Sequence, residues 1–443
     1  MNRRKFLKRS SAILGLTVLA DGYSALAIEP NPAFPNGDQR WQRTWDAAIA
    51  VLLGNIKTVP RYNHPVLVEG SVYPGVWQEC APQEGLVYAN LRRYIPAQGG
   101  IPAPLQIARD NHMAFFSLQR PDGQLPASVK MSATGYGQLQ MVVPIAATAW
   151  ELSQMIHDEE FLTTAYQSCS MWDLWLRKYR DTRKTGLVEG FCVYDTGHDN
   201  SPRWAGVPKQ CPNADARQYD HTVESLPRLC PDLSASVYGG RVALAAMAAA
   251  LGKKEEAERW EEDARTIRRL IDEKLYDTVD AAFYDLDAQN HFVRVRSDVI
   301  SRVLGEHVLD ATRLRDNDIF NSIWERQIHN QNAFWAPYPL TSIAQDDPAF
   351  VRPIPRNSWG GATQALTALR APRWMTYYGK QTEQVQMMRQ WCEAISRYTE
   401  FRQQMDPLTG DFTRVDPSGY SPAALVYLDF IVRLAALNNG SMR

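Results

Sequence analysis

Residues 194–204 read YDTGHDNSPRW and gather the side chains that acid–base chemistry needs. Asp195 and Asp199 are two carboxylates four residues apart, and the neighbouring Gly and Pro indicate a loop. Arg203 offers a planar fork for carboxylates or hydroxyls, and Trp204 offers an apolar face to a sugar ring. A carboxylic acid beside an apolar wall keeps its proton to higher pH, as a general acid requires. The alternative is a capped loop whose aspartates satisfy backbone donors.

Helices must position this loop, because helical periodicity dominates the chain. Apolar side chains at 260, 264, 267, 271 and 275 recur every three or four residues, which puts them on one helix face. Similar patterns predict helices at about 44–57, 103–119, 144–156, 158–180, 234–251, 308–326, 361–378, 382–404 and 421–438.

Strand signals are sparse, and the clearest predicts a hairpin from 283–285 to 292–295. Helices in sequential pairs, joined by long loops rich in Trp, Pro and Gly, suit a toroid of nested helix pairs. A helical solenoid for protein binding is the alternative, but no repeat of fixed length is visible. No Gly/Ser-rich or Pro-rich linker divides residues 28–443, so we predict one domain there.

The first 27 residues predict export. Arg3 and Arg4 form a twin-arginine pair, an apolar run spans residues 12–20, and residues 25–27 form a small-residue cleavage site. The apolar run is about half the length that a membrane span needs. We therefore expect the twin-arginine translocase as an export partner, cleavage after Ala27, a periplasmic or secreted protein, and no integral membrane segment afterwards.

Composition excludes several classes of function. Lys and Arg number 48 against 49 Asp and Glu, so no basic surplus favours nucleic-acid binding. No Cys-x-x-Cys or His-Glu-x-x-His spacing suggests a metal, and we expect no cofactor. Six cysteines in 443 residues are too few for a disulfide scaffold, although Cys211 and Cys230 flank one loop and could pair after export.

Several ordered motifs add a resemblance. The Asp199–Trp204 stretch resembles the Gly-x-Asp-Asn-Ser-Pro-Arg-Trp segment of (α/α)6 glycosidases, a group that includes trehalases, mannosylglycerate hydrolases and the processing α-glucosidases of glycoside hydrolase family 63. Further motifs in the same order resemble this group at residues 231–235, 275–285, 337–348, 357–361 and 406–421. The similarity spans about residues 70–430. Together with the helical periodicity, this resemblance implies an all-α (α/α)6 toroid with minor β-hairpins in the loops.

The resemblance implies roles for individual residues. The family's general acid maps onto Asp199, and its sugar-lining Trp–carboxylate pair falls at Trp77 and Glu79. We expect Trp359 and Tyr420 to be walls of the sugar pocket, since rings stack on sugar faces. The remaining expected substrate contacts are Asp195, Asn200, Arg203, Trp204 and Asp232. Asp195 has orientation of Arg203 as its alternative role, and Asp232 has that of a helix N-cap.

The sequence departs from the family's pattern at the position of the catalytic general base. The family's general base is a Glu three residues before an Asn/Asp-Pro pair, and this position holds Gln403. A carboxamide cannot deprotonate water near neutral pH. Gly360 and Gln364 also stand where the family has an Arg and an aromatic residue. The candidates for a relocated base are Glu79, Glu306 at a helix start, and Glu400, which the predicted helix places on one face with Gln403.

Two functions follow as expectations. The first is an exported, inverting glycoside hydrolase that acts on an α-linked disaccharide or oligosaccharide with Asp199 as acid. Inversion needs two carboxyl groups roughly 6.5–9.5 Å apart with a water between them. The second is a carbohydrate-binding or vestigial protein that keeps the fold and has lost the base.

Overall fold

The computed structural model describes residues 38–96, 99–352, 359–413 and 416–438. The predicted signal segment, residues 1–27, lies outside the described residues, as do Asn357 and Ser358 of the 357–361 motif.

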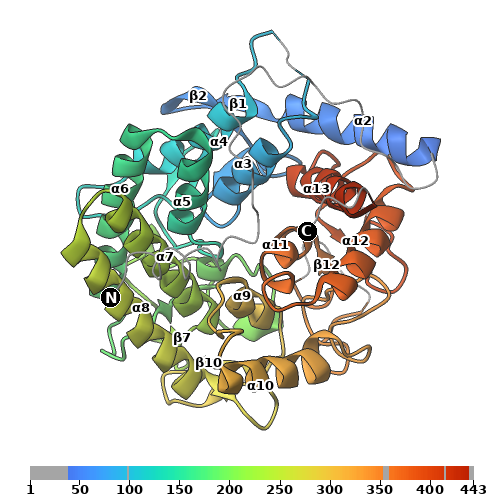
Figure 1. Cartoon of the computed structure of the whole chain (residues 1–443). Helices are drawn as coiled ribbons and strands as arrows, with labels where there is room; N and C mark the ends of the chain where they lie inside the picture. Colours follow the sequence, from blue (N-terminus) through green and yellow to red (C-terminus); the bar gives the residue numbers. More distant parts are fainter. Residues whose placement is uncertain (1–37, 97–98, 353–358, 414–415, 439–443) are drawn as a thin grey trace.

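Six helices form a closed inner ring (Figure 1). Each contacts the next along the chain, and the last returns to contact the first. They are α3 (Ala81–Asn90), α5 (Ile145–Ile156), α7 (Pro231–Ala250), α9 (Val299–Gly305), α11 (Ala365–Met375) and α13 (Ser421–Asn438).

Six further helices lie outside this ring, as Figure 1 shows. They are α2 (Gln39–Gly54), α4 (Pro104–Phe116), α6 (Glu159–Tyr179), α8 (Lys254–Leu275), α10 (Leu314–Ile323) and α12 (Gln381–Ile395). The α3–α4, α5–α6 and α7–α8 pairs are antiparallel neighbours along the chain, and α2 packs on α13. The alternation of inner and outer helices is the (α/α)6 toroid that the sequence predicted.

Burial separates the two rings. All seven residues of α9 are buried, whereas only five of the 22 residues of α8 are, at the periodic apolar positions. Among the described residues, α7 is the one helix long and apolar enough to cross a membrane, and 67% of its apolar window is buried inside the toroid. Its hydrophobicity is therefore explained by its place in the inner ring.

Short strands connect the helices. The pairs are β1 (Ile56–Val59) with β2 (Tyr62–Leu67), β8 (Tyr276–Asp277) with β9 (Ala282–Phe283), and β12 (Thr363–Gln364) with β13 (Gln404–Met405). A three-stranded sheet joins β3 (Gly75–Trp77), β4 (Ser128–Lys130) and β5 (Thr134–Gly135). A four-stranded sheet has the order β11 (Phe292–Val293), β10 (Asp285–Leu286), β7 (Arg228–Leu229) and β6 (Glu189–Gly190). The β10–β11 pair confirms the predicted hairpin.

The predicted helix over 382–404 is wrong at its end. The α12 helix stops at Ile395, and the chain then passes through a turn and an irregular segment to β13. The hydroxyl of Thr44 donates to the carbonyl of Tyr398 at 2.7 Å, so a contact from α2 stabilises this irregular segment. Glu400 and Gln403 therefore do not share a helix face.

Candidate active site

The N-terminal ends of the inner helices meet at one end of the toroid. Glu79 lies just before α3, Asp232 is in the first turn of α7, and Asp298 is the N-cap of α9. Trp359 precedes α11, and Tyr420 directly precedes α13. Helix N-termini carry partial positive charge, which favours the carboxylates gathered there.

The loop that holds Asp199 is anchored by Asp195. The Arg180 guanidinium donates to both Asp195 oxygens at 2.6 and 3.0 Å, and the backbone N–H groups of Leu139 and Phe191 donate to them at 2.7 Å. Asp195 is completely buried. Its oxygens are thus engaged within the protein, so the structure favours an anchoring role over the predicted sugar contact.

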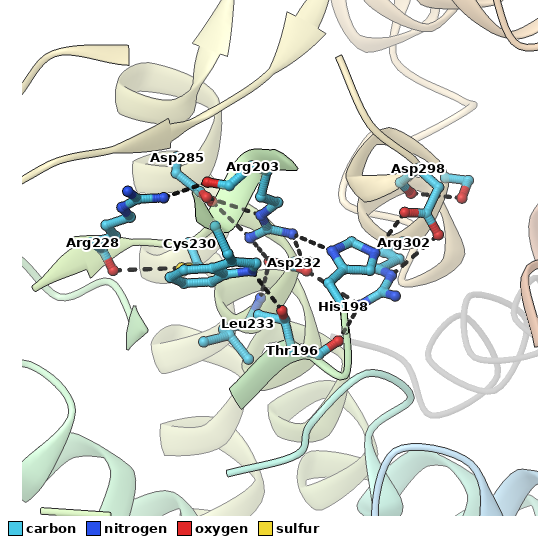
Figure 2. Close-up of polar contacts among 12 residues, drawn as sticks. Thr196, His198, Arg203, Arg228, Cys230, Asp232, Leu233, Asp285, Asp298 and Arg302 are labelled. Atoms are coloured by element: carbon cyan, nitrogen blue, oxygen red, sulfur yellow. Dashed lines mark hydrogen bonds and ion pairs between the residues drawn. The ribbon is translucent and has the colours of Figure 1, made fainter. Parts of the chain in front are cut away.

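Arg203 is a second buried anchor of the same loop (Figure 2). Its guanidinium forms two-point contacts with Asp232, at 2.8 and 2.9 Å, and with Asp285, at 2.8 and 2.9 Å. Burial alone would raise the pKa of Asp232, but the Arg203 and Arg302 guanidinium groups lower it to about 2. Arg203 and Asp232 therefore form an internal ion pair, which engages the charged groups that were expected to contact substrate.

His198 connects this ion pair to the helix α9. Its Nδ1 faces the Arg203 guanidinium at 3.0 Å and therefore acts as an acceptor, while Nε2 faces the Asp298 carboxylate at 2.6 Å. Burial, reinforced by Arg302 and Arg203, lowers the pKa of His198 to about 4. The imidazole is therefore neutral at pH 7. Its ring packs on Trp359 with centroids 4.9 Å apart, which places the Asp199 loop beside Trp359.

Asp199 itself is half-buried, whereas the next residue, Asn200, is exposed and has a left-handed backbone, with φ of 58°. The charge of Asp199 reaches several neighbours. Together with burial it raises the pKa of Tyr194, and it contributes to the raised pKa of Tyr73 and of Glu69. Asp199 thus lies at the edge of a group of acidic and phenolic side chains.

Glu79 lies against the Asp199 loop. Its Oε2 sits so close to Gly197 that a Cβ there would lie 1.5 Å away, and the φ of 61° at Gly197 also favours glycine. Burial raises the pKa of Glu79, and the nearby Arg370 and Arg302 guanidinium groups oppose that rise. Trp77 is half-buried two residues earlier and packs edge-on against Tyr73, with ring centroids 5.6 Å apart.

Two hydrogen bonds join the opposite side of the site. The Tyr73 hydroxyl donates to Gln403 Oε1 at 3.0 Å, and the Tyr420 hydroxyl donates to Glu69 Oε1 at 2.8 Å. The rings of Tyr73 and Tyr420 have centroids 6.1 Å apart. Gln403 therefore belongs to the site, and Glu69, the partner of Tyr420, is a carboxylate that none of the sequence motifs indicated.

The signal for Glu69 was present in the chain. It is the first acidic residue after the buried apolar run of residues 66–68, and it precedes Gly70, whose φ of 81° marks a turn. A carboxylate where a buried strand ends is a candidate site residue. Arg302 and Arg370 gave no such signal, because each lies inside an inner helix and outside the loop motifs.

The other two base candidates lie elsewhere. Glu306 follows the last residue of α9 and lies about 12 Å along the helix from Asp298, at a rise of about 1.5 Å per residue. Burial raises its pKa to about 8, and its charged neighbours are Arg373, Glu151 and Arg370. Glu400 accepts two hydrogen bonds from Arg402, at 2.7 and 2.9 Å, and is partly exposed.

The aromatic residues differ in their surroundings. Trp204 is 2% exposed, lies between the guanidinium groups of Arg203 and Arg228, and donates to Thr196 Oγ1 at 3.0 Å. Its ring therefore packs inside the protein against the loop and has little exposed surface for a sugar. Trp359 is also 2% exposed but contacts His198, next to Asp199.

Three buried groups among the described residues have metal-ligand composition. Two of them contain Asp195 or the Asp232–Asp285 pair, whose oxygens already bind a guanidinium that would repel a cation. The third combines Glu69, Glu79 and Cys80. The geometry of the site suits acid–base chemistry by these carboxyl groups.

Comparison with known proteins agrees with this geometry. Residues 97–421 match the family described as the mannosylglycerate hydrolase MGH1-like glycoside hydrolase domain. The chain belongs to this family. It is a glycoside hydrolase of the family 63-like type, and the match covers most of its length.

Solved structures show the same fold. The family 63 mannosylglycerate hydrolase from Thermus thermophilus, in complex with Tris, is 18% identical, with a TM-score of 0.66 over 87% of this chain and 99% of that one. Neutral trehalase from Saccharomyces cerevisiae is 13% identical, with a TM-score of 0.61 over 86% and 76%. A bacterial glucoamylase complexed with acarbose is 12% identical, with a TM-score of 0.55 over 89% and 55%. No curated protein matches this glycoside hydrolase in sequence.

The cysteines are arranged differently from the predicted pair. Cys211 Sγ lies 3.6 Å from Cys192 Sγ, whereas Cys230 Sγ contacts the carbonyl of Arg228 at 3.5 Å. All six are free thiols and buried. The partner available to Cys211 is therefore Cys192.

Proposed function

We propose that this glycoside hydrolase is an exported enzyme that cleaves an α-linked disaccharide or oligosaccharide with inversion, using Asp199 as the general acid. The observation that carries the proposal is the contrast between the two aspartates of one loop. Asp195 is wholly buried and engaged by Arg180, whereas Asp199 is partly open to solvent beside Trp359 and Tyr73. Asp199 is thus the carboxyl placed to reach a leaving oxygen.

The rigid anchors support this role. General acids need a fixed position within hydrogen-bond reach of the proton acceptor. Arg180 holds the loop before Asp199, and Arg203 holds it after, in both cases through two-point contacts with carboxylates. This arrangement fixes the backbone on both sides of Asp199.

The substrate class is proposed from the family's description as mannosylglycerate hydrolase-like and from a structural neighbour that is named a mannosylglycerate hydrolase. The test is a panel of α-mannosides, α-glucosides, trehalose and α-linked oligosaccharides. On any substrate that is cleaved, Asp199→Asn should reduce kcat roughly 10²–10⁴-fold, because the amide keeps the size of the side chain but cannot deliver a proton.

A matched control is Asp220→Asn, because Asp220 is an aspartate that bonds only locally to Thr222 and lies on the surface. Its kcat should equal that of the unaltered enzyme. Retention of full activity by Asp199→Asn would contradict the proposal.

Gln403 favours a second candidate function, carbohydrate binding without hydrolysis. The amide stands at the family's base position and accepts a hydrogen bond from Tyr73. Gly360 removes a further polar contact expected from the family pattern. Calorimetric binding of a glycan without turnover of any panel member would support this candidate over the enzyme.

Export is a separate part of the proposal, supported by the twin-arginine pattern of residues 1–27. Mass spectrometry of protein recovered outside the cytoplasm should show a chain beginning near residue 28. A soluble cytoplasmic protein that retains residues 1–27 would contradict it.

A further inference from the structure

A neutral amide at the family's base position leaves the water-activating group to be found. Among the carboxyl groups of the described residues, Glu69 and Glu79 form a close buried pair. One oxygen of each, together with Cys80 Sγ, lies within 4.8 Å of the others. Glu69 is 3% exposed and Glu79 is 8% exposed.

Two carboxyl groups at this distance in a buried site cannot both be ionised, so they share one proton. The surroundings show which group holds it. Glu79 has Arg370 and Arg302 among its close charged neighbours, and both favour its ionised form. The charged neighbours of Glu69 are Glu84, Glu79 and Asp199, which all disfavour its ionisation. Burial raises the pKa of both groups, but the guanidinium neighbours make Glu79 the member of the pair that ionises more readily.

Glu79 is also the member of the pair that adjoins the acid loop. Its Oε2 is packed on Gly197, and two residues of chain span at most about 7 Å to Asp199. An inverting pair has its carboxyl groups roughly 6.5–9.5 Å apart. By contrast, Glu306 lies at the far end of α9 and Glu400 is bonded to Arg402.

We propose that Glu79, coupled to a neutral Glu69, is the general base of this enzyme. The proposal rests on the proposed function, in which Asp199 is the acid. As the water oxygen bonds to the anomeric carbon, one water proton passes to the Glu79 carboxylate. The glycosidic carbon–oxygen bond breaks, and the Asp199 proton passes to the leaving oxygen. Exchange with solvent then returns both carboxyls to their starting states.

Substitutions of the pair test its asymmetry. Glu79→Gln should lower kcat roughly 10²–10⁴-fold with little change in KM, because the amide cannot accept the water proton. Glu69→Gln should keep kcat within about tenfold, because an amide reproduces the neutral, hydrogen-bonding partner. Glu306→Gln is the control, a half-buried carboxyl at the far end of α9, and should leave kcat unchanged.

Rescue by an external nucleophile distinguishes a base from a sugar-binding residue. With Glu79→Ala, azide should enter the vacated space and give a glycosyl azide of inverted configuration, since azide needs no base. Glu79→Asp serves if the alanine variant does not fold, and it should lower kcat while leaving KM unchanged.

Three results would overturn the assignment: a raised KM with unchanged kcat in Glu79→Gln, no glycosyl azide from Glu79→Ala, or loss of activity in Glu69→Gln with activity kept in Glu79→Gln. Each would leave the acid role standing if Asp199→Asn is inactive. Failure of the acid role is recognised separately, because Asp199→Asn would then remain active.

A second inference concerns Cys192 and Cys211, which enclose the acid loop. Their sulfur atoms are 3.6 Å apart, and the backbone N–H groups of Val193 and Tyr194 donate to the carbonyls of Pro208 and Lys209 at 3.0 and 3.1 Å. The chain is thus already paired beside the thiols. A disulfide needs a sulfur–sulfur distance of about 2.05 Å, so only a small approach is required.

We infer that a small-molecule or protein disulfide oxidises this pair and ties the two ends of the acid loop together. Cys211 Sγ lies 3.7 Å from the Arg180 guanidinium. Loss of the Cys211 proton to solvent starts the exchange. The Cys211 thiolate attacks the oxidant, expels one thiolate, and forms a mixed disulfide. Cys192 then loses its proton and attacks the Cys211 sulfur, which expels the second thiolate.

Incubation of the full chain with oxidised glutathione tests this step. Alkylation in denaturant should then find four of the six thiols reactive, and peptide mapping should link residues 192 and 211. Cys192→Ser should abolish the link, and Cys169→Ser, a buried control, should retain it. Six reactive thiols after oxidation, or a link from Cys211 to Cys230, would overturn the inference.

Discussion

The segment around Asp199 and the segment around Gln403 meet at the same end of the toroid but differ in chemistry. Buried ion pairs surround the first, where Arg180 and Arg203 each engage carboxylates through two-point contacts. Hydrogen bonds between neutral groups characterise the second, where Tyr73 donates to Gln403 and the Gln364 amide donates to Gln404 Oε1 at 3.1 Å.

The difference indicates separate roles for the two segments. Charge pairs fix the loop that supplies a proton, and an amide network lines the side where the family has its base. Because amides cannot accept the water proton, a negative charge must come from a third segment, and Glu79 before α3 supplies one. Substitutions around Asp199 should therefore lower stability, whereas substitutions around Gln403 should shift the pH dependence of kcat.

Arg203→Leu should have the largest effect, a loss of stability around Asp199. The change leaves Asp232 and Asp285 buried without their guanidinium, and loss of one partner of a buried pair costs about 3–5 kcal/mol. Urea denaturation should show this loss. Arg217→Leu is the control, because the exposed Arg217–Asp215 pair should contribute less than about 1 kcal/mol. An Arg203→Leu variant as stable as the Arg217→Leu control would contradict the anchoring role of Arg203.

The contributions of His198 and of Glu84 to stability should depend on pH in opposite directions. The pKa of His198 is lowered to about 4, so its contribution to stability is complete above pH 6.5 and is lost as pH falls toward 4. Glu84, close to Glu69, has a pKa raised to about 7, so its contribution is complete below pH 4.5 and is lost as pH rises to 7. Each effect is on the order of 3 kcal/mol.

His198→Gln and Glu84→Gln separate these contributions. The free energy of unfolding should be measured from pH 4 to 8. In His198→Gln it should depend less on pH between 4 and 6.5 than in the unaltered protein. In Glu84→Gln it should depend less on pH between 4.5 and 7. Identical pH profiles for both variants and the unaltered protein would contradict the assigned charge states.

Gln403→Glu should slow the enzyme about tenfold, the effect of roughly one pKa unit. A new carboxylate beside Tyr73 and Asp199 would disturb the protonation of the existing acid and base. The pH dependence of kcat measures the shift. An increase in activity would show instead that the natural site lacks a working base, and an unchanged profile would show that Gln403 does not face the water.

Tyr420→Phe should have the smallest effect. It removes the hydrogen bond to Glu69, worth about 0.5–1.5 kcal/mol, and that bond opposes the rise in the pKa of Glu69. We expect a modest loss of stability and kcat within a few-fold of the unaltered enzyme, measured by denaturation and kinetics. A loss as large as that of Glu79→Gln would place Tyr420 in the chemistry itself.

The sequence predicted the fold where helices are amphipathic. The α8 helix was recognised from its apolar face, but α3 and α9 were missed. Nine of the ten residues of α3 and all seven residues of α9 are buried. These helices therefore have no solvent-facing side that would give a periodic pattern of polar residues. The order of loop motifs supplied the closed toroid that periodicity alone could not.

The site was predictable only in part. Motifs brought Asp199, Glu79, Trp359 and Tyr420 to one end of the toroid, and the structure places them together. The roles of Arg203 and Asp232 were not predictable, because the Arg203–Asp285 contact joins residues 82 positions apart. Local spacing cannot show which buried carboxylates a distant guanidinium will neutralise.

The configuration of the first-formed sugar decides whether Asp199 and Glu79 act as an inverting pair. Hydrolysis of an α-glycoside by the unaltered enzyme should be followed by proton NMR before mutarotation. An acid at Asp199 and a base at Glu79 with a water between them predict the β-anomer as the first product. Initial release of the α-anomer would show retention and would contradict this pairing.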